Sequence, residues 1–371
     1  MSLEKLAEIS RVYGGDTEYV IAGGGNTSFK DDNFLYIKAS GTSLAMVKPG
    51  DFVKMERKGL AAIWKKDYPS DPDAREAAVL ADMMTSRCVG EENKRPSVET
   101  LLHDLLPFAY VVHLHPALVN GLTCSQDGQS AAKELFPEAI WIPSINPGFI
   151  LSRAVKDALD NKKLPDQNKL IILLQNHGIF VAANTVEEIK VIYNNVMETL
   201  RKKIKKNPDF SEECNSYNDS KTLEKEILSL AQKFEPGIEW YTNFSRNKQI
   251  LIFSLNETAF KPISSAFSPD HIIYSGDNPL FINDASMLEK QFKDYTDKYS
   301  KTPKIIVIKF LGVFGLANSM KALENALEVF KDTQKIAVYS ESFGGPLFMS
   351  DEQIYFINNW EVERYRTKVA V

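Results

Sequence analysis

The stretch that most constrains the fold is residues 169–206, where two apolar segments precede a helical pattern. The segment "KLIILLQNHGIFVAAN" is long enough for two buried strands, and Asn176–Gly178 interrupts it in the middle. The segment "TVEEIKVIYNNVMETLRKKIKK" then has helical periodicity, with Thr185 as the N-cap and Glu188 completing a capping box. Strands followed closely by a capped helix predict an α/β protein.

The same alternation of strands and helices precedes this stretch. Residues 19–47 predict three short strands separated by a glycine turn and a "DD" turn. Further strands are predicted at residues 108–115 and 139–145. Helices are predicted at residues 1–13, 71–88, 95–107, from about 116, and at 149–161. Asp71 is placed to cap the second of these helices, and Ser97 to open the third.

A polar segment, residues 206–222, separates two regions. It carries turn-forming residues and few aliphatic ones, so it predicts a linker between a first domain at 1–205 and a smaller α/β domain at 223–371. In the second region, "KIIVIKFLGVFGLANSMKALENALEVFKD" predicts a strand, a glycine loop and a helix, and "KIAVYSES" predicts another strand. The segment "DEQIYFINNWEVERYR" predicts a terminal helix capped by Asp351. No internal repeat at a fixed period is evident.

Composition narrows the class of protein. Acidic residues outnumber basic ones, 49 against 44, and the net charge of −5 argues against a nucleic-acid-binding surface. Three widely spaced cysteines without a CxxC pair indicate a reducing compartment. The start "MSLEKLAEISRVYGG" lacks the apolar core of a signal peptide, and no uncharged apolar run reaches the roughly 18 residues of a membrane span. We therefore expect a cytoplasmic protein.

Two of the five histidines, His113 and His115, end the apolar run "YVVHLH". Alternate residues of a strand share a face, so both imidazoles would point to one side and Leu114 to the core. Such a pair suits a metal ion. His177 is the candidate third ligand, because Gly178 lets the backbone turn and direct a side chain out of the sheet. The alternative is a chance HxH pair and a solvated turn histidine.

Glu99 is the candidate general base. It follows Ser97 in the first turn of a helix that leads into the histidine strand, so its carboxylate could reach the open side of a bound metal. The alternative is a glutamate that only the helix dipole favours there. His103, four residues later, is expected to support the site or cap a backbone group. His271, in the second region, is expected to be structural or to lie at an interface.

Three polar elements before the histidine pair suit a phosphate. They are "AGGGNTS" at residues 22–28, "ASGTS" at residues 39–43, and Ser97 at a helix start. Their backbone N–H groups and hydroxyls can bind an anion. "GGGN" is not the dinucleotide-binding pattern GxGxxG, and no helix follows it directly. Together these elements favour a small phosphorylated ligand.

The order "GGGNTSFK", "KASGTSL", "RPSVETLLH", "HLHP" and "NHGIFV" resembles the class II aldolase/adducin family. The resemblance covers roughly residues 1–205. Within the family, the chain most resembles the aldolase part of rhamnulose-1-phosphate aldolase/alcohol dehydrogenase fusion proteins. The segments that carry this likeness are "PSVETLLHDLLPFAYVVHLHP" and "INPGF". Residues 223–371, with "NNWEVERYR", resemble the segment that follows the aldolase part in those fusions. Their dehydrogenase domain is expected to be absent here.

This resemblance implies a zinc enzyme on an αβα sandwich built around a mostly antiparallel sheet. The residues that it implies are the Zn²⁺ ligands His113, His115 and His177, the catalytic Glu99, and the phosphate-binding Asn26, Ser40, Gly41 and Ser97. Zinc would stabilise an enediolate as a Lewis acid while Glu99 moves the proton. Val98 departs from the simpler members, which have serine there. No counterpart is evident for a tyrosine that a neighbouring subunit contributes in some members.

The function implied is a zinc-dependent aldolase that cleaves a deoxyketose 1-phosphate, such as rhamnulose 1-phosphate, into dihydroxyacetone phosphate and an aldehyde. Glu99 favours this over an epimerase, because related epimerases carry aspartate there, whereas a dehydratase stays open. A non-catalytic, adducin-like binding module is a further alternative, against which the intact histidines argue. The expected partners are a small phosphorylated sugar and other copies of the chain in a homo-oligomer, with no nucleic acid and no membrane.

Overall fold

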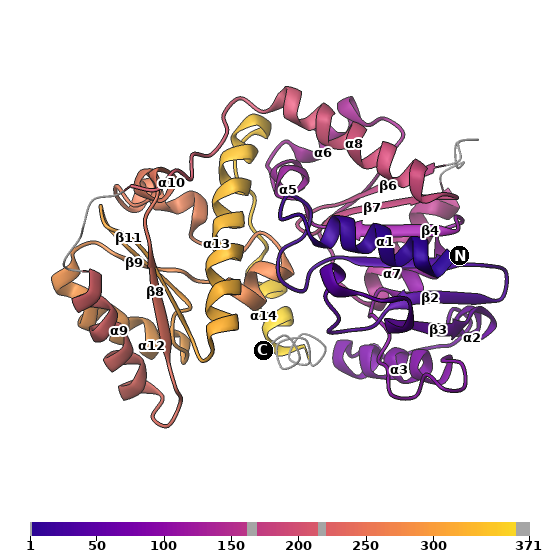
Figure 1. Ribbon diagram of the computed structural model, residues 1–371, viewed down its shortest axis with the longest axis horizontal. Coiled ribbons are helices and arrows are strands. Elements are labelled where there is room, and N and C mark those ends of the chain that lie inside the picture. Colours follow the sequence, from indigo (N-terminus) through magenta and orange to yellow (C-terminus); the bar gives the residue numbers. More distant parts are fainter. Residues whose placement is uncertain (1, 162–168, 214–219, 361–371) are drawn as a thin grey trace.

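The computed structural model describes residues 2–161, 169–213 and 220–360 (Figure 1). The first sheet contains β1 (Asn26–Lys30), β2 (Phe34–Lys38), β3 (Phe52–Glu56), β4 (Tyr110–Leu114), β5 (Ile140–Ile142), β6 (Lys169–Leu174) and β7 (Gly178–Ala183). The helices around it are α1 (Ser2–Gly14), α2 (Arg57–Ile63), α3 (Pro72–Thr85), α4 (Thr100–Leu105), α5 (Ala117–Thr123), α6 (Gly128–Leu135), α7 (Phe149–Asn161) and α8 (Val186–Lys203).

These strands form a sheet in the order β3-β2-β1-β4-β7-β6-β5. Neighbouring strands are antiparallel except for β5 and β6, which are parallel. Apolar residues of α1, α5, α6 and α8 cover one face, while α4 and α7, together with α2 and α3, cover the other. The fold is therefore the αβα sandwich around a mostly antiparallel sheet that the family resemblance implies.

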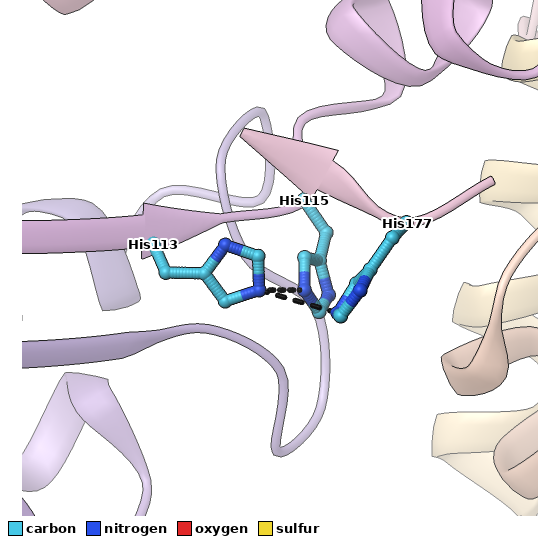
Figure 2. Close-up of side chains that lie close together, drawn as sticks. All are labelled: His113, His115 and His177. Atoms are coloured by element: carbon cyan, nitrogen blue, oxygen red, sulfur yellow. Dashed lines mark hydrogen bonds between the residues drawn. The ribbon is translucent and has the colours of Figure 1, made fainter. Parts of the chain in front are cut away.

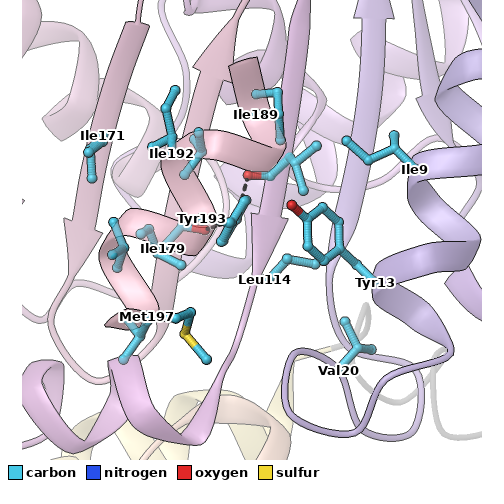
Figure 3. Close-up of a cluster of buried hydrophobic side chains, with 14 of the residues drawn as sticks. Ile9, Tyr13, Val20, Leu114, Ile171, Ile179, Ile189, Ile192, Tyr193 and Met197 are labelled. Carbon is cyan, nitrogen blue, oxygen red and sulfur yellow. Dashed lines mark hydrogen bonds between the residues drawn. The ribbon is translucent and has the colours of Figure 1, made fainter. Parts of the chain in front are cut away.

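The central strand β4 is buried at every residue. On one face, Leu114 packs in the same apolar cluster as Ile179 and Tyr193 (Figure 3). The Tyr193 hydroxyl donates a hydrogen bond to the Val112 carbonyl oxygen over 3.0 Å, so this fully buried polar group is satisfied. Because Leu114 points into this core, the neighbouring His113 points to the opposite face, as predicted.

A second sheet follows α9 (Ser220–Phe234). Its strands are β8 (Tyr241–Ser245), β9 (Leu280–Ile282), β10 (Ile305–Ile308) and β11 (Gly312–Ala317). The remaining helices are α10 (Lys248–Phe253), α11 (Glu257–Phe260), a π-helical turn (His271–Ser275), α12 (Leu288–Tyr299), α13 (Met320–Ser340) and α14 (Asp351–Asn359). No helix in the described part of the chain has both the length and the apolar character needed to cross a membrane.

The second sheet also lies between two helical layers. Helices α9 and α12 cover one face, and α10 and α13 cover the other. Figure 1 shows α13 standing between the two sheets. It packs against α5 so closely that a Cβ on Gly121 would lie 2.4 Å from the Cβ of Tyr339. One apolar cluster contains Ala117 and Cys124 of the first region with Phe330 and Ile336 of the second, so the two regions share a core between α5 and the second sheet.

The second sheet repeats the topology of half of the first. Its order is β8-β11-β10-β9, and the corresponding half of the first sheet is β4-β7-β6-β5. In both, the first two pairs are antiparallel and the last pair is parallel. In chain order, α7 precedes β6 and α12 precedes β10. The long helices α8 and α13 follow β7 and β11 in the same way. The two regions are therefore built on one strand–helix plan.

The correspondence extends to single residues. Strands β7 and β11 both begin with glycine, and a non-glycine residue with positive φ lies two positions earlier, Asn176 (56°) or Phe310 (60°). Thr185 and Ser319 cap the helices that follow. Each of these pairs is separated by 134 residues, whereas β4 and β8 begin 131 residues apart and β5 and β9 begin 140 apart. The unequal spacing explains why no fixed period is evident in the sequence.

Some predictions about secondary structure were wrong. Residues 19–22 form no strand, and Tyr19 and Ala22 lie in turns. Residues 335–342 were predicted as a strand, but residues 335–340 complete α13, because Ile336, Ala337 and Val338 pack in the core between α5 and the second sheet. The expected glycine loop "GVFG" is the start of β11.

Two helix starts also differ from the prediction. Helix α4 begins at Thr100, with Glu99 at its N-cap position in place of Ser97. Ser350, not Asp351, caps α14 through a capping box with Gln353. The last part of the predicted terminal helix, residues 361–366, lies outside the described residues.

The predicted linker begins soon after α8 ends. Residues 206–213 run beside the second sheet, where the carbonyl oxygen of Asp209 accepts a hydrogen bond from the Gln249 N–H over 2.8 Å. Residues 214–219 of the predicted linker lie outside the described residues, and α9 begins at Ser220. The division into two domains at this segment stays a prediction.

The glycines of β11 lead to a prediction about nucleotides. Gly315 pairs with both neighbouring strands and Gly312 pairs with β10, so these glycines belong to the sheet and do not form a loop that wraps a phosphate. We expect neither NAD nor ATP to bind the second region. Calorimetric titration of the purified protein with each nucleotide is the measurement, and micromolar binding of either would overturn the prediction.

Candidate metal centre and substrate cavity

Three histidine rings converge at the end of β4 (Figure 2). His113 lies on β4, His115 follows the strand directly, and His177 lies in the turn between β6 and β7. The Nε2 atom of His113 is 2.9 Å from that of His115 and 3.3 Å from that of His177. Nitrogen ligands of a tetrahedral zinc, each about 2.0–2.1 Å from the metal, lie roughly 3.3–3.4 Å apart. The spacing therefore suits one small divalent cation.

The turn that presents His177 depends on two different backbone features. Asn176 takes the positive φ, and the His177 N–H donates to the Leu174 carbonyl oxygen over 3.2 Å. Gly178 is required by close approach instead: a Cβ there would lie 2.5 Å from the Leu114 carbonyl oxygen and 2.7 Å from the His115 ring. Glycine thus lets the His177 turn lie directly against the end of β4.

In His113 and His115, a contact at Nδ1 leaves Nε2 as the nitrogen that faces the centre of the histidine cluster. His113 Nδ1 lies 3.0 Å from the Ile179 carbonyl oxygen, which can only accept. His115 Nδ1 lies 2.6 Å from the Asp270 carboxylate. Nδ1 is therefore a donor in both rings, and in the neutral form of each ring the lone pair is on Nε2, which faces the Nε2 of the other ring.

This donor set fits a metal ion. Neutral rings with lone pairs facing each other at 2.9 Å repel, and a cation between them removes that repulsion. Burial lowers the pKa of His177 well below its usual range, with the neighbouring His113 and His115 adding to the effect, so His177 also stays neutral. Neutral imidazoles are the form that binds metals. In the described residues, these three side chains form the one such cluster of His, Cys, Asp and Glu ligands.

Glu99 lies beside the three rings. Its Oε1 is 3.2 Å from His113 Nε2 and 3.7 Å from His177 Nε2, and Asn26 Nδ2 donates to its Oε2 over 3.3 Å. Burial raises the pKa of the Glu99 carboxyl, but positive charge at the histidine cluster lowers it more, so that this pKa lies well below its usual range. Glu99 is therefore a carboxylate at neutral pH, as a general base requires. Its side chain makes no capping bond to α4.

A cavity of about 70 Å³ adjoins this cluster. The structure brings all the sequence-predicted site residues to its wall: Asn26, Ser40, Gly41, Ser97, Glu99, His113, His115 and His177. Asn26 Nδ2 also donates to the Ser97 hydroxyl, so the amide joins the predicted phosphate side to the predicted base. Val98, the departure from the simpler members, lies on the same wall and packs against apolar residues of the second region.

Three residues with polar side chains on the cavity wall were not predicted from the sequence: Lys38, Asp270 and Tyr274. Lys38 is 5% exposed, and its Nζ donates to the Thr42 carbonyl oxygen over 2.7 Å. The sequence could have indicated Lys38, because it ends β2 two positions before Ser40, and alternate residues of an extended segment share a face. Asp270 and Tyr274 come from the second region, and nothing in their sequence surroundings relates them to the histidines.

The two other histidines do not join the cluster. His103 is fully buried on the Glu99 side, where its Nδ1 lies 2.7 Å from the Ser28 hydroxyl and its ring contacts Phe180. Burial lowers its pKa to about 3, so it is a neutral packing residue. His271 is buried in the second region, with Nδ1 2.8 Å from the Ser268 hydroxyl. Its role there is structural.

Comparison with known proteins places this arrangement in a family. Residues 4–202 match the class II aldolase and adducin N-terminal domain. The chain belongs to the class II aldolase and adducin family. It is also 20% identical to the "Uncharacterized oxidoreductase YuxG" of Bacillus subtilis (strain 168) over 413 aligned positions. That alignment covers 99% of this chain but only 58% of the relative, so the chain spans little more than half of the relative's length.

Solved structures of this family resemble about half of the chain. The N-terminal class II aldolase domain of a conserved protein from Thermoplasma acidophilum is 24% identical, with a TM-score of 0.47, covering 54% of this chain and 93% of that one. An L-fuculose-1-phosphate aldolase from Thermus thermophilus is 17% identical, with a TM-score of 0.34, covering 53% of this chain and 92% of that one.

Proposed function

We propose that the protein is a zinc-dependent class II aldolase that cleaves a deoxyketose 1-phosphate, such as rhamnulose 1-phosphate, into dihydroxyacetone phosphate and an aldehyde. The observation that carries this proposal is the position of Glu99, whose Oε1 lies 3.2 Å from His113 Nε2 beside three converging imidazoles. A carboxylate base next to a Lewis acid suits proton transfer at a carbon adjacent to a carbonyl. Family membership supports the same class of reaction.

The roles of the residues follow from their positions. Zinc bound by the histidines would supply a Lewis acid for the substrate's carbonyl oxygen. Glu99 would accept a proton from the carbon of dihydroxyacetone phosphate in the synthetic direction and return it in the cleavage direction. Asn26 holds the Glu99 carboxylate through Oε2, which leaves Oε1 toward the rings. The hydroxyls of Ser40 and Ser97, with the backbone at Gly41, would bind the phosphate.

Metal analysis combined with an assay of dihydroxyacetone phosphate release tests this proposal. Protein purified without chelator is expected to contain about one zinc per chain and to release dihydroxyacetone phosphate from at least one member of a panel of ketose 1-phosphates. Chelation should abolish the release, and added zinc should restore it. A metal-free protein that is indifferent to zinc would refute the proposal. Interconversion of sugar phosphates without release would identify an epimerase, and loss of water a dehydratase.

Lys38 provides a test of the phosphate side. Replacing it with methionine keeps the aliphatic stem but removes the cation from the cavity wall. A hydrogen bond to a charged group is worth about 1.5–3 kcal/mol, so the KM for the phosphorylated substrate should rise roughly 10–100-fold. Bound zinc should not change.

Lys30→Met is the matched control for this variant. Lys30 is equally buried on the neighbouring strand, where its Nζ donates to the His103 carbonyl oxygen over 2.5 Å and does not line the cavity. Its loss should reduce stability and leave the KM unchanged. If Lys38→Met had the wild-type KM, Lys38 would have no part in phosphate binding.

A further inference from the structure

The second region reaches into the candidate metal centre through one carboxylate. Asp270 Oδ2 lies 2.6 Å from His115 Nδ1, although the two residues are 155 positions apart in the chain. Asp270 immediately precedes the π-helical turn His271–Ser275 and is 8% exposed. The hydrogen bond is therefore partly shielded from water and joins the two regions at a candidate ligand.

His115 depends on this partner more than His113 does. His113 lies within β4, its ring stacks on Phe180 with centroids 3.9 Å apart, and the Ile179 carbonyl oxygen holds its Nδ1. His115 follows the last residue of β4, so no strand pairing orients it. The carboxylate at its Nδ1 comes from the other region. A carboxylate at this atom fixes the tautomer, directs Nε2 to the metal and raises the basicity of the ring.

The backbone that carries Asp270 is anchored to the first region near His177. Asn176 Nδ2 donates to the Phe267 carbonyl oxygen over 3.1 Å and to the Leu347 carbonyl oxygen over 2.8 Å. The Cys124 thiol lies 3.5 Å from the same Phe267 oxygen. Asn176, next to the candidate ligand His177, thus fixes the segment that carries Asp270, the partner of the candidate ligand His115.

The glycine-rich loop makes room for this segment. A Cβ on Gly24 would lie 2.7 Å from Asp270 Oδ2 and 3.3 Å from His115 Nδ1, and a Cβ on Gly23 would lie 2.5 Å from the Tyr274 hydroxyl. Neither glycine has a positive φ, so close approach is what requires a missing side chain. Gly23 and Gly24 belong to the loop that was predicted to bind phosphate, and side chains of the second region pack against both of them.

The second sheet has no equivalent metal ligands of its own among the described residues. Strand register matches its residues Phe244, Arg246 and Leu311 to the three histidines His113, His115 and His177. Among the described residues, the second region can therefore act on a metal only by reaching the histidines of the first sheet.

We infer that the second region completes the metal centre, with Asp270 as a positioning residue that orients His115. The inference rests on the proposed metal site and adds to it a role for residues 223–371. The variants that test it are Asp270→Ala, which removes the hydrogen bond, and Asp270→Asn, which keeps a weaker one. Loss of such an outer partner typically weakens metal binding about 10–100-fold, and Asp270→Asn should lie between Asp270→Ala and the wild type.

The readout is the zinc dissociation constant of the full-length apo-protein, measured by competition with a chromophoric chelator. The visible spectrum of the cobalt-substituted protein should also change in Asp270→Ala, because the geometry at the metal changes. Gly24→Ala provides an independent variant, since its methyl group displaces the carboxylate without removing any polar group. It should weaken zinc binding in the same direction, and it covers the case in which Asp270→Ala does not fold.

Asp277→Ala is the matched control. Asp277 is also a buried aspartate of the second region, 4% exposed and paired with Lys301 and Asn358, but it does not line the metal cavity. Its loss should lower stability and leave zinc affinity unchanged. Equal zinc affinity in the wild type, Asp270→Ala and Gly24→Ala would overturn the inference and leave the metal site intact. The same conclusion would follow if Asp277→Ala weakened zinc binding as much as Asp270→Ala does. A wild-type protein that binds no zinc would instead refute the proposed function.

Discussion

Replacing Glu99 with glutamine is expected to lower turnover at least about 100-fold while bound zinc stays close to one per chain, because general-base catalysis contributes on the order of 10²–10⁴ in rate. Glutamine keeps the shape of the side chain and can still accept the hydrogen bond from Asn26. Its amide cannot take up a proton at neutral pH. The three imidazoles are unchanged, so the loss should fall on the chemical step.

The alternative, a glutamate that only stabilises its helix, predicts a different result. Glutamine would then reduce stability by about 0.3–1 kcal/mol and leave turnover intact. The structure weakens this alternative, because the Glu99 side chain makes no capping bond to α4 and is directed to the histidines. Zinc content, thermal stability and the rate of ketose phosphate cleavage, measured on one preparation, distinguish the two. Near wild-type turnover would remove Glu99 from the mechanism.

Replacing His113 with alanine should remove most of the bound metal. His113 is the central ligand, with Nε2 2.9 Å from His115 and 3.3 Å from His177, and two remaining imidazoles bind far more weakly than three. The loss of zinc affinity should exceed the roughly 10–100-fold that removal of an outer partner causes. Cleavage activity should disappear with the metal.

His103→Ala is the control for lost packing. His103 is a fully buried histidine whose ring also contacts Phe180, with centroids 5.3 Å apart, but it is not a member of the ligand cluster. Both variants leave a cavity and should reduce stability. Only His113→Ala should lose zinc, as measured by elemental analysis of protein purified without chelator. Equal zinc content in the two would show that His113 is not a ligand.

The candidate site was predictable where its residues are close in sequence to a recognisable element. Period-two alternation at the end of an apolar run directs His113 and Leu114 to opposite faces, whatever surrounds the strand. The interruption at Asn176–Gly178 marks a turn in the same way. Capping residues such as Thr185 and Asp71 were also predictable, because a cap acts on N–H groups within one helical turn.

Errors arose where a segment's environment outweighs its local pattern. Residues 335–340 are apolar enough for a buried strand, yet they continue α13, because that helix is buried between the second sheet and α5 of the first region. "GVFG" has the composition of a loop but lies within β11, where Val313, Phe314 and Gly315 pair with both neighbouring strands. Local composition does not distinguish these cases, because burial on two sides is a property of the assembled layers.

Residues that the sequence relates to the metal are thus those whose direction follows from strand alternation, a turn or a helix start: His113, His115, His177 and Glu99. The partner of His115 was not predictable in this way. Asp270 lies 155 residues from it, in a region whose strands repeat half of the first sheet with unequal spacing, and it is brought there by packing of α13 on α5 and by Asn176 holding the Phe267 backbone. A long-range hydrogen bond depends on how complete layers pack, and no local pattern in the chain encodes that arrangement.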